Sequence, residues 1–509
     1  MTGQVVWVIG VLIVYLAAIL FIGLWSMRYA RFTLEDYAMG SRSFGFWILF
    51  STVFAANISA VTLIGIPGAA YHVGWIMWPY FVTSWGWFTP WLFWLLSNRA
   101  WILGQRYGYM TQAEIIKNRW DSPALGVLFS ICLLFYSVPY LMTGIQGGGN
   151  ALAGLTGNAI PYWAGCLIVA VIVCAYLVAG GMRGAAWVNT LQAAIFMVGV
   201  VIIFFSVANV FGGMTQATQQ VAEKYSWLLD RSKFSWKTFY SYGFIVALSV
   251  PVFPQVFMRM ITGRSPRALK GTTMVYPLAG LIVFFTMAYS GMWGHLGFPD
   301  LKGAESDKIL PMLLATYLHP ALMAVLGSAM FAALMSTLDS QLWAVSVIFI
   351  KDFFLGKKTT AVTVNEAQAV KWSRIITILL TALAFILAQF KIIGIINIVN
   401  FAFAGFAVLI WPMFAALWWR RCTKQAAAAS IISSQFVLLG LQYGILPKAW
   451  AFGFLPGLPA IVVGLVVLVA VTYLTPAPVN KGTQEFFETF AMIAPKQSAS
   501  HLATGRQTV

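Results

Sequence analysis

The sequence predicts an all-α integral membrane protein of about thirteen transmembrane helices, with a core of two inverted five-helix repeats. The first observation is composition: 60% of the 509 residues are hydrophobic and only 9% are charged, which is more apolar than a soluble protein requires. The second is the recurrence of apolar windows of about twenty residues, each long enough to cross a bilayer. The third is a pair of spans, five apart in order, that both contain helix breakers.

The apolar windows define the expected spans. The first run is longer than the core of a signal peptide and lacks a small-residue cleavage site, so we expect it to be retained as a span. The polar tail after residue 475 is expected to be disordered, apart from a short amphipathic patch at 486–494. The expected spans are 5–27, 46–70, 75–97, 124–147, 161–180, 186–208, 239–261, 273–294, 321–350, 374–390, 392–417, 427–446 and 453–474.

The basic residues give the expected orientation. Most of the 31 Lys and Arg residues fall in one alternate set of loops, with Arg259 counted there as the end of its helix. By the positive-inside rule the N-terminus is outside and the C-terminus is cytoplasmic, in a multi-pass protein of the cell (inner) membrane. The net charge of +17 is then a topology signal, which predicts the lipid bilayer and not nucleic acid as a partner. Asp339 is the only charge placed within a span.

Helix breakers interrupt the second and the seventh spans. The second contains Asn57-Ile-Ser and then Gly65-Ile-Pro-Gly, and the seventh contains Pro251 and Pro254. Unwound backbone at membrane depth is tolerated only beside protein or a water-filled cavity, although Gly and Pro are also common in ordinary membrane helices. Broken helices at matching positions of two repeats are typical of secondary transporters.

Hydroxyl groups follow one face of the ninth span. On a helix, Ala333, Ser336, Thr337 and Ser340 share a face by three-and-four spacing, and Asp339 lies near its edge. Hydroxyl and carbonyl oxygens gathered at membrane depth suit a hard cation such as Na⁺. An alternative interpretation is that the hydroxyls bond back to the preceding turn and only bend the helix.

Five segments, in order along the chain, resemble the sodium:solute symporter family, and the resemblance runs from about residue 5 to 475. It implies a LeuT-like fold and membership beside proline, pantothenate and monocarboxylate symporters. The segments are 35–43, 54–60 with 65–69, 180–192, 254–259 and 335–340. The implied units are a first helix and cytoplasmic loop at 1–45, five-helix repeats at 46–208 and 209–417, two further helices at 418–475, and a cytoplasmic tail at 476–509.

The resemblance also implies a sodium site between the first broken helix and the ninth span. Carried over by position, the ligands are the backbone carbonyls of Ala55, Ile58 and Ala333 and the hydroxyls of Ser336 and Thr337. The implied co-transported ion is therefore Na⁺. This agrees with the hydroxyl face found from spacing alone.

The chain departs from the family pattern at two positions. Many members have Asp in the helix after the Gly-Gly loop, where this chain has Asn189, and this chain instead has Asp339 beside Ser340. We expect Asp339 to supply the negative charge that Asn189 lacks, either on the exit path of Na⁺ or holding a second ion. Alternatively, Asp339 is protonated or faces water in the inner vestibule.

The implied substrate site lies between the two broken helices. With no Arg or Lys placed at midplane, an anionic substrate would meet helix N-termini and neutral donors, which favours a small carboxylate such as a monocarboxylate, pantothenate or an amino acid. For any one candidate residue, ordinary packing is an equal alternative. The candidates are Asn57, Ser59, Thr62, Tyr80, Ser84, Tyr140, Gln146, Pro251, Pro254 and Gln255.

Together these features predict a sodium-coupled symporter that imports a small organic solute by alternating access. One alternative is a proton-coupled symporter of the same fold in which Asp339 titrates. Another is a transporter-like sensor, which the short tail disfavours. No His–carboxylate pair is placed together in the membrane, so an enzyme is not predicted. No obligate protein partner is evident.

Overall fold

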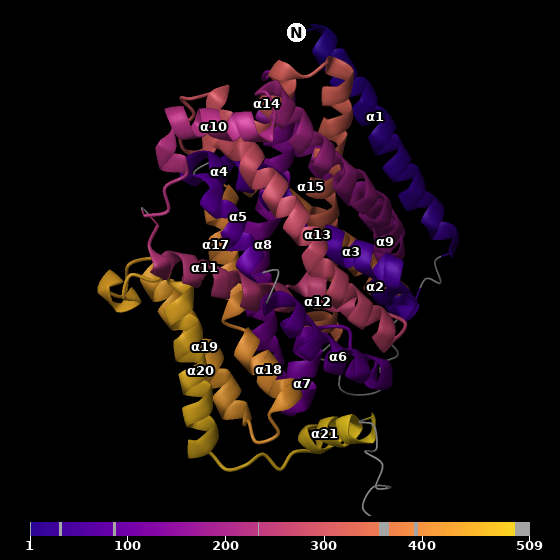
Figure 1. Ribbon diagram of the computed structural model, residues 1–509. Helices are drawn as coiled ribbons and strands as arrows, with labels where there is room; N and C mark the ends of the chain where they lie inside the picture. Colours follow the sequence, from indigo (N-terminus) through magenta and orange to yellow (C-terminus); the bar gives the residue numbers. More distant parts are fainter. Residues whose placement is uncertain are drawn as a thin grey trace, which may run out of the picture.

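The computed structural model describes residues 2–29, 33–84, 88–232, 234–355, 366–390 and 395–493. These residues form helices and connecting loops without any strand, apart from one isolated bridge between Phe44 and Gly263, which confirms the predicted all-α class. In Figure 1 the N-terminus lies at the top of the molecule and the last helix lies at the bottom.

The helices follow one another with short connections (Figure 1). Their bounds are α1 (Thr2–Trp25), α2 (Leu34–Met39), α3 (Phe46–Asn57), α4 (Ile66–Val73), α5 (Met77–Thr83), α6 (Thr89–Tyr107), α7 (Gln112–Arg119), α8 (Pro123–Leu155), α9 (Tyr162–Val210), α10 (Met214–Lys224), α11 (Trp236–Ser249), α12 (Pro254–Met260), α13 (Pro266–Trp293), α14 (Ile309–Tyr317), α15 (Pro320–Ile348), α16 (Glu366–Gln389), α17 (Ile395–Ala407), α18 (Ile410–Trp418), α19 (Lys424–Gln442), α20 (Gly457–Leu474) and α21 (Lys481–Ile493). The predicted amphipathic patch falls in α21, except for residue 494, which is outside the described residues.

The described residues contain eight helices that are long and apolar enough to cross a membrane, and up to ten spans when two bent helix pairs are included. The protein is therefore a multi-pass membrane protein, while the count of thirteen stays a prediction. The two counts differ partly because α9 is counted once, although its 49 residues are roughly twice the length that a bilayer needs. They also differ because α6 and α19, with 19 residues each, are not among the eight helices.

A kink at Gly181 divides α9 into two helices. Gly181 has φ 56° and ψ −151°, which is a conformation open essentially only to glycine. A Cβ atom there would also lie 2.5 Å from the ring of Tyr37. The sequence-predicted boundary between the spans 161–180 and 186–208 falls at this kink.

The two broken helices are present, each bent by 52°. In the first, α3 ends at Asn57 and the chain becomes helical again only at Val61. In the second, Phe253 is extended with ψ 125°, because the ring of Pro254 disfavours a helical conformation in the residue before it. The Gly65-Ile-Pro-Gly motif, however, does not break its helix. Its proline lies where the π-helical turn Val61–Gly65 passes directly into α4, and the chain stays helical through the motif.

α15 lies in the interior of the molecule. The middle of this helix is 83% buried, the largest fraction among the candidate spans, so its hydroxyl face looks into protein and not into lipid. A glycine face of α8 permits this close packing: a Cβ at Gly147 would come within 2.6 Å of Ala60 and 2.8 Å of Leu334. The boundaries of the two five-helix repeats stay a prediction.

Candidate cation and substrate sites

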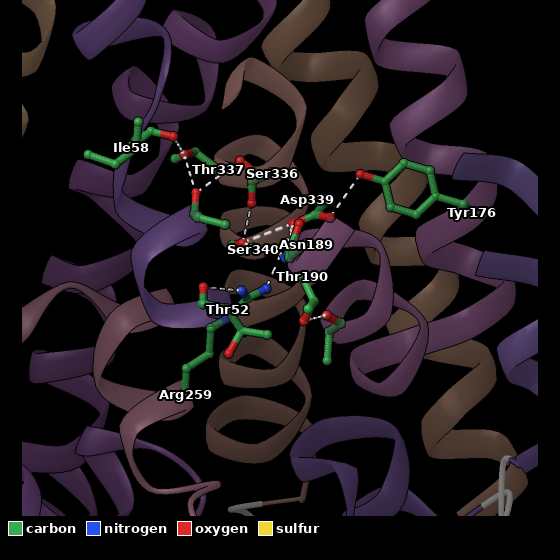
Figure 2. Close-up of polar contacts among 12 residues, drawn as sticks. Thr52, Ile58, Tyr176, Asn189, Thr190, Arg259, Ser336, Thr337, Asp339 and Ser340 are labelled. Atoms are coloured by element: carbon green, nitrogen blue, oxygen red, sulfur yellow. Dashed lines mark hydrogen bonds and ion pairs between the residues drawn. The ribbon is translucent and has the colours of Figure 1, made fainter. Parts of the chain in front are cut away.

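The five oxygens of the expected cation site lie together where α15 faces the break after α3 (Figure 2). The Ser336 hydroxyl lies 2.9 Å from the Ala55 carbonyl and 3.0 Å from the Ala333 carbonyl. The Thr337 hydroxyl lies 3.1 Å from the Ala55 carbonyl and 3.0 Å from the Ile58 carbonyl. All five residues are buried.

The helix break explains why the Ala55 and Ile58 carbonyls are available. In an uninterrupted helix the Ser59 N–H would donate to the Ala55 carbonyl, but here it points to the Thr62 hydroxyl at 3.5 Å. Ser340 behaves as the alternative interpretation expects, because its hydroxyl donates back to the Ser336 carbonyl. Thr337 does not, because its hydroxyl lies within hydrogen-bond distance of the Ala55 and Ile58 carbonyls across the break.

The donor set is neutral and consists of oxygen atoms. Within the described ranges there is no group of three or more His, Cys, Asp or Glu residues that could hold a metal ion. Two hydroxyls and three backbone carbonyls suit a hard monovalent cation better than a transition metal, which prefers nitrogen and sulfur ligands.

Asp339 lies beside this site, fully buried, with three polar side chains within hydrogen-bond distance of its carboxylate (Figure 2). The Tyr176 hydroxyl donates to Oδ2 at 2.8 Å. Asn189 Nδ2 donates to Oδ1 at 3.2 Å, and the Ser340 hydroxyl lies 2.9 Å from the same oxygen. The structure thus brings together Asp339, Asn189 and Ser340, the three residues expected to form an exit path or a second ion site.

Arg259 was wrongly assigned to the basic loops by the sequence analysis, and Asp339 is not the only charge within a span. Arg259 belongs to α12, the second half of a bent span, and none of its surface is exposed. Its Nη2 lies 3.8 Å from Asp339 Oδ1, and its Nη1 donates to the Thr52 carbonyl at 2.6 Å. A position near the end of an apolar window looks like a loop in sequence, and only the fold shows that neighbouring helices cover it.

Three of the substrate candidates lie together at the first break. Asn57 Nδ2 donates to the hydroxyl of Tyr276, and the Tyr140 hydroxyl pairs with Ser59. Tyr276 is fully buried in α13 and was not predicted, because nothing in the sequence places α13 against the break. Gln255 is also fully buried, and in the described part of the chain neither polar atom of its amide has a hydrogen-bond partner.

The remaining candidates do not join this group. Thr62 accepts from its own turn, and the Ser84 hydroxyl donates to the preceding turn of its own helix. Gln146 is buried on α8, and the described residues provide no partner for its Nε2. Tyr80 borders a separate cavity. Pro251 and Pro254 shape the second break, with Pro254 beginning α12.

That cavity has a volume of about 520 Å³ and is lined by residues of α4, α5, α11 and α17. Tyr80, Tyr242 and Asn400 contribute to its lining. In Figure 1, α4 and α5 lie nearer to the N-terminus than α6 and α7. At the opposite end, side chains tie the helices together. Gln112 Nε2 donates to the Val252 carbonyl at 2.6 Å, next to the second break.

A second tie at this end joins the π-helical turn Phe349–Leu355, which continues from α15, to α8 and to the start of α7. The carboxylate of Asp352 accepts from Thr111 at 2.9 Å and from Ser130 at 2.7 Å. The molecule therefore has one cavity of about 520 Å³ lined by α4, α5, α11 and α17, and a second cavity of the same volume lined by α7, α8 and Asp352.

Broken helices that flank a buried oxygen-lined site define a membrane solute transporter of the inverted-repeat type. A model of the sodium:solute symporter family matches residues 37–433, and the chain belongs to this family. The predicted resemblance is confirmed.

Individual relatives agree with this assignment. The chain is 29% identical over 475 residues to the sodium/pantothenate symporter of Escherichia coli (strain K12), covering 89% of this chain and 94% of that protein. It is 24% identical over 507 residues to the sodium/proline symporter of the same organism, covering 93% and 94%. Among solved structures, a Na⁺-coupled sialic acid symporter in a substrate-bound outward-open state superposes with a TM-score of 0.78 at 18% identity, covering 92% of this chain and 98% of that one. At 18% identity, the similarity to the sialic acid symporter shows that the fold is shared.

Proposed function

We propose that the protein is a sodium-coupled symporter that imports a small carboxylate, with Na⁺ held by the Ala55, Ile58 and Ala333 carbonyls and the Ser336 and Thr337 hydroxyls. The observation that carries the proposal is that these oxygens, from a helix and a helix break far apart in sequence, lie within hydrogen-bond distance of one another. On binding, Na⁺ would replace these hydrogen bonds with ion–oxygen contacts and tie α15 to the break. Neutral ligands form a weak, reversible shell, as an ion that must be released requires.

The cavity and the ties support transport by alternating access. We assign the end that carries the N-terminus to the outside, so the 520 Å³ cavity lined by α4 and α5 is the outer vestibule. The Gln112–Val252 contact then joins α7 to the second break on the cytoplasmic side. Na⁺ and substrate would enter through the outer vestibule. To open toward the cytoplasm, the protein must break the contact between Gln112 of α7 and Val252. Moving one charge across 100 mV supplies about 2.3 kcal/mol for this uptake.

The substrate proposal rests on donors and on relatives. The named relatives carry pantothenate and proline, which both have a carboxylate. Arg259 is held by Thr52 and Asp339, so a substrate carboxylate would meet the side-chain amides of Gln255 and Asn57 instead. We therefore assign pantothenate, proline and simple monocarboxylates as the first compounds to test.

The experiment is thermal unfolding of the purified full chain in Na⁺ and in K⁺, with each compound added, followed by uptake into proteoliposomes. A ligand at a hundredfold excess over its Kd adds about 2.7 kcal/mol to the free energy of unfolding. We expect a sodium-specific rise in Tm that one carboxylate increases further. A shift on lowering the pH, together with equal Tm values in Na⁺ and K⁺, would favour proton coupling and contradict the proposal.

A further inference from the structure

We propose that the Arg259 guanidinium is the resident cation of the Asp339 carboxylate, so that the protein carries one Na⁺ in each transport cycle and not two. This inference rests on the proposed sodium-coupled function. It decides between the two roles expected for Asp339: the carboxylate shapes the exit path of the ion and does not hold a second one.

The first step is the burial of both charges. Neither Arg259 nor Asp339 exposes any side-chain surface, and Nη2 and Oδ1 are 3.8 Å apart. Removing a single charge from water into a protein interior is costly unless an opposite charge lies nearby. The two residues come from different helices, α12 and α15, so the pairing is made by the fold.

Second, the Arg259 guanidinium faces the Asp339 carboxylate, and most of its N–H groups have no other acceptor. Nη1 donates to the Thr52 carbonyl at 2.6 Å. Nε and Nη2 have no hydrogen-bond partner among the described residues, which leaves Asp339 as the anion for this side of the guanidinium. A distance of 3.8 Å is longer than a charge-assisted hydrogen bond, so the pairing is electrostatic.

The third step is that the carboxylate oxygens already have partners. Oδ2 accepts from Tyr176, and Oδ1 lies within hydrogen-bond distance of Asn189 and Ser340. With two donors, the Ser340 hydroxyl and one guanidinium around it, Asp339 has both the contacts and the countercharge that a buried carboxylate needs. A second Na⁺ here would leave the cluster with a net positive charge in a buried environment, which is unfavourable.

The last step connects the pair to the proposed Na⁺ site. The Ser340 hydroxyl lies between Asp339 Oδ1 and the carbonyl of Ser336, whose own hydroxyl is a proposed Na⁺ ligand (Figure 2). A change of charge at Asp339 or Arg259 therefore acts on Na⁺ across one serine. The pair keeps this neighbourhood neutral, so Na⁺ is neither trapped nor repelled as it leaves.

The test is equilibrium binding of radiolabelled sodium to the purified full chain at alkaline pH, where protons compete least. We expect one Na⁺ per wild-type chain. In Arg259→Gln the carboxylate loses its resident cation, and we expect two. The double variant Arg259→Gln/Asp339→Asn is neutral again and should bind one. Arg267→Gln, which removes an exposed arginine from the first turn of α13, is the matched control and should also bind one.

Affinity provides a second readout that a merely structural role would not move. Asp339→Asn leaves the guanidinium unpaired near the proposed site, and its repulsion should weaken Na⁺ binding about tenfold. Removing the guanidinium as well, in the double variant, should restore the affinity. Each preparation is checked for monodispersity, and only the folded fraction is counted.

Three outcomes would overturn the inference: two Na⁺ ions on the wild-type chain, one Na⁺ on folded Arg259→Gln, or unchanged Na⁺ affinity in Asp339→Asn. If Arg259→Gln yields no folded protein, the wild-type count and the Asp339→Asn affinity still decide it. Failure of the proposed function would look different. The wild-type chain would then show no saturable binding that is selective for Na⁺ over K⁺.

Discussion

The Thr337 hydroxyl lies 3.0 Å from the Ile58 carbonyl, a contact between α15 and the non-helical turn that follows α3. The turn exists because the helix stops at Asn57, and stopping it releases carbonyls that a continuous helix would use internally. A cation that replaces this contact would bind both elements at once. At the proposed site, the affinity for Na⁺ and the position of the broken helix would therefore be coupled through the same two residues.

Replacing Ser336 or Thr337 by alanine should weaken Na⁺ binding. Each change removes one ligand oxygen of the proposed site, at a cost of about 1.5 kcal/mol, or roughly tenfold in Kd. The measurement is the Na⁺ dependence of Tm and of uptake. Ser328→Ala is the matched control, because Ser328 is buried on the same helix but bonds only back to Ala324 at 3.1 Å. Equal Na⁺ dependence in all three variants would remove these hydroxyls from the site.

Gln255→Leu should separate stability from substrate binding. Both polar atoms of the Gln255 amide are buried without a partner among the described residues, and such groups destabilise a fold by about 1–3 kcal/mol. We expect the leucine variant to keep or raise its Tm without ligand and to lose the extra stabilisation given by the substrate.

The control for this substitution is Gln192→Leu. Gln192 Nε2 donates to the Tyr15 hydroxyl of α1 at 3.0 Å, so its loss should lower Tm and leave the response to substrate intact. A Gln255→Leu variant that responds to substrate like the wild-type chain would show that Gln255 only fills space.

Sequence could predict what depends on local chemistry. Apolar windows gave the membrane class, and Pro254 marked the second break because proline constrains the residue before it. The spacing of Ser336 and Thr337 placed both on one face of a helix. What depends on the packing of distant helices was not predictable: Arg259 looked like the end of a loop and Tyr276 like an ordinary aromatic residue, and only the packing around α12 and α13 buries them.

Gly181→Ala should destabilise the protein by about 2 kcal/mol or more. The residue has φ 56° and ψ −151°, where a side chain costs about 1–3 kcal/mol, and the new Cβ would also meet the Tyr37 ring at 2.5 Å. The measurement is Tm of the purified protein. Gly10→Ala in α1 is the control, since nothing lies within 4 Å of its Cβ position and its Tm should not fall. Equal Tm values for the two variants would mean that the kink tolerates a side chain.

The last helix, α21, is expected to be a structural part of the transporter and not a loose tail. In Figure 1 it lies beneath α6 and α7, and its Phe486 is fully buried against the rings of Tyr107 and Tyr109. Truncating a buried phenylalanine costs about 3–5 kcal/mol in a well-packed core, so Phe486→Ala should lower Tm clearly.

Met492→Ala, at a side chain that is 66% exposed on the same helix, is the control and should leave Tm unchanged. Because the contacts of α21 lie on α6 and α7, and Gln112 of α7 holds the Val252 carbonyl beside the second break, its loss should also loosen that contact. We therefore expect Phe486→Ala to increase the rate of backbone amide hydrogen exchange in α7 as well as in α21. An exchange increase confined to α21 would show that the helix packs on the core without supporting that contact.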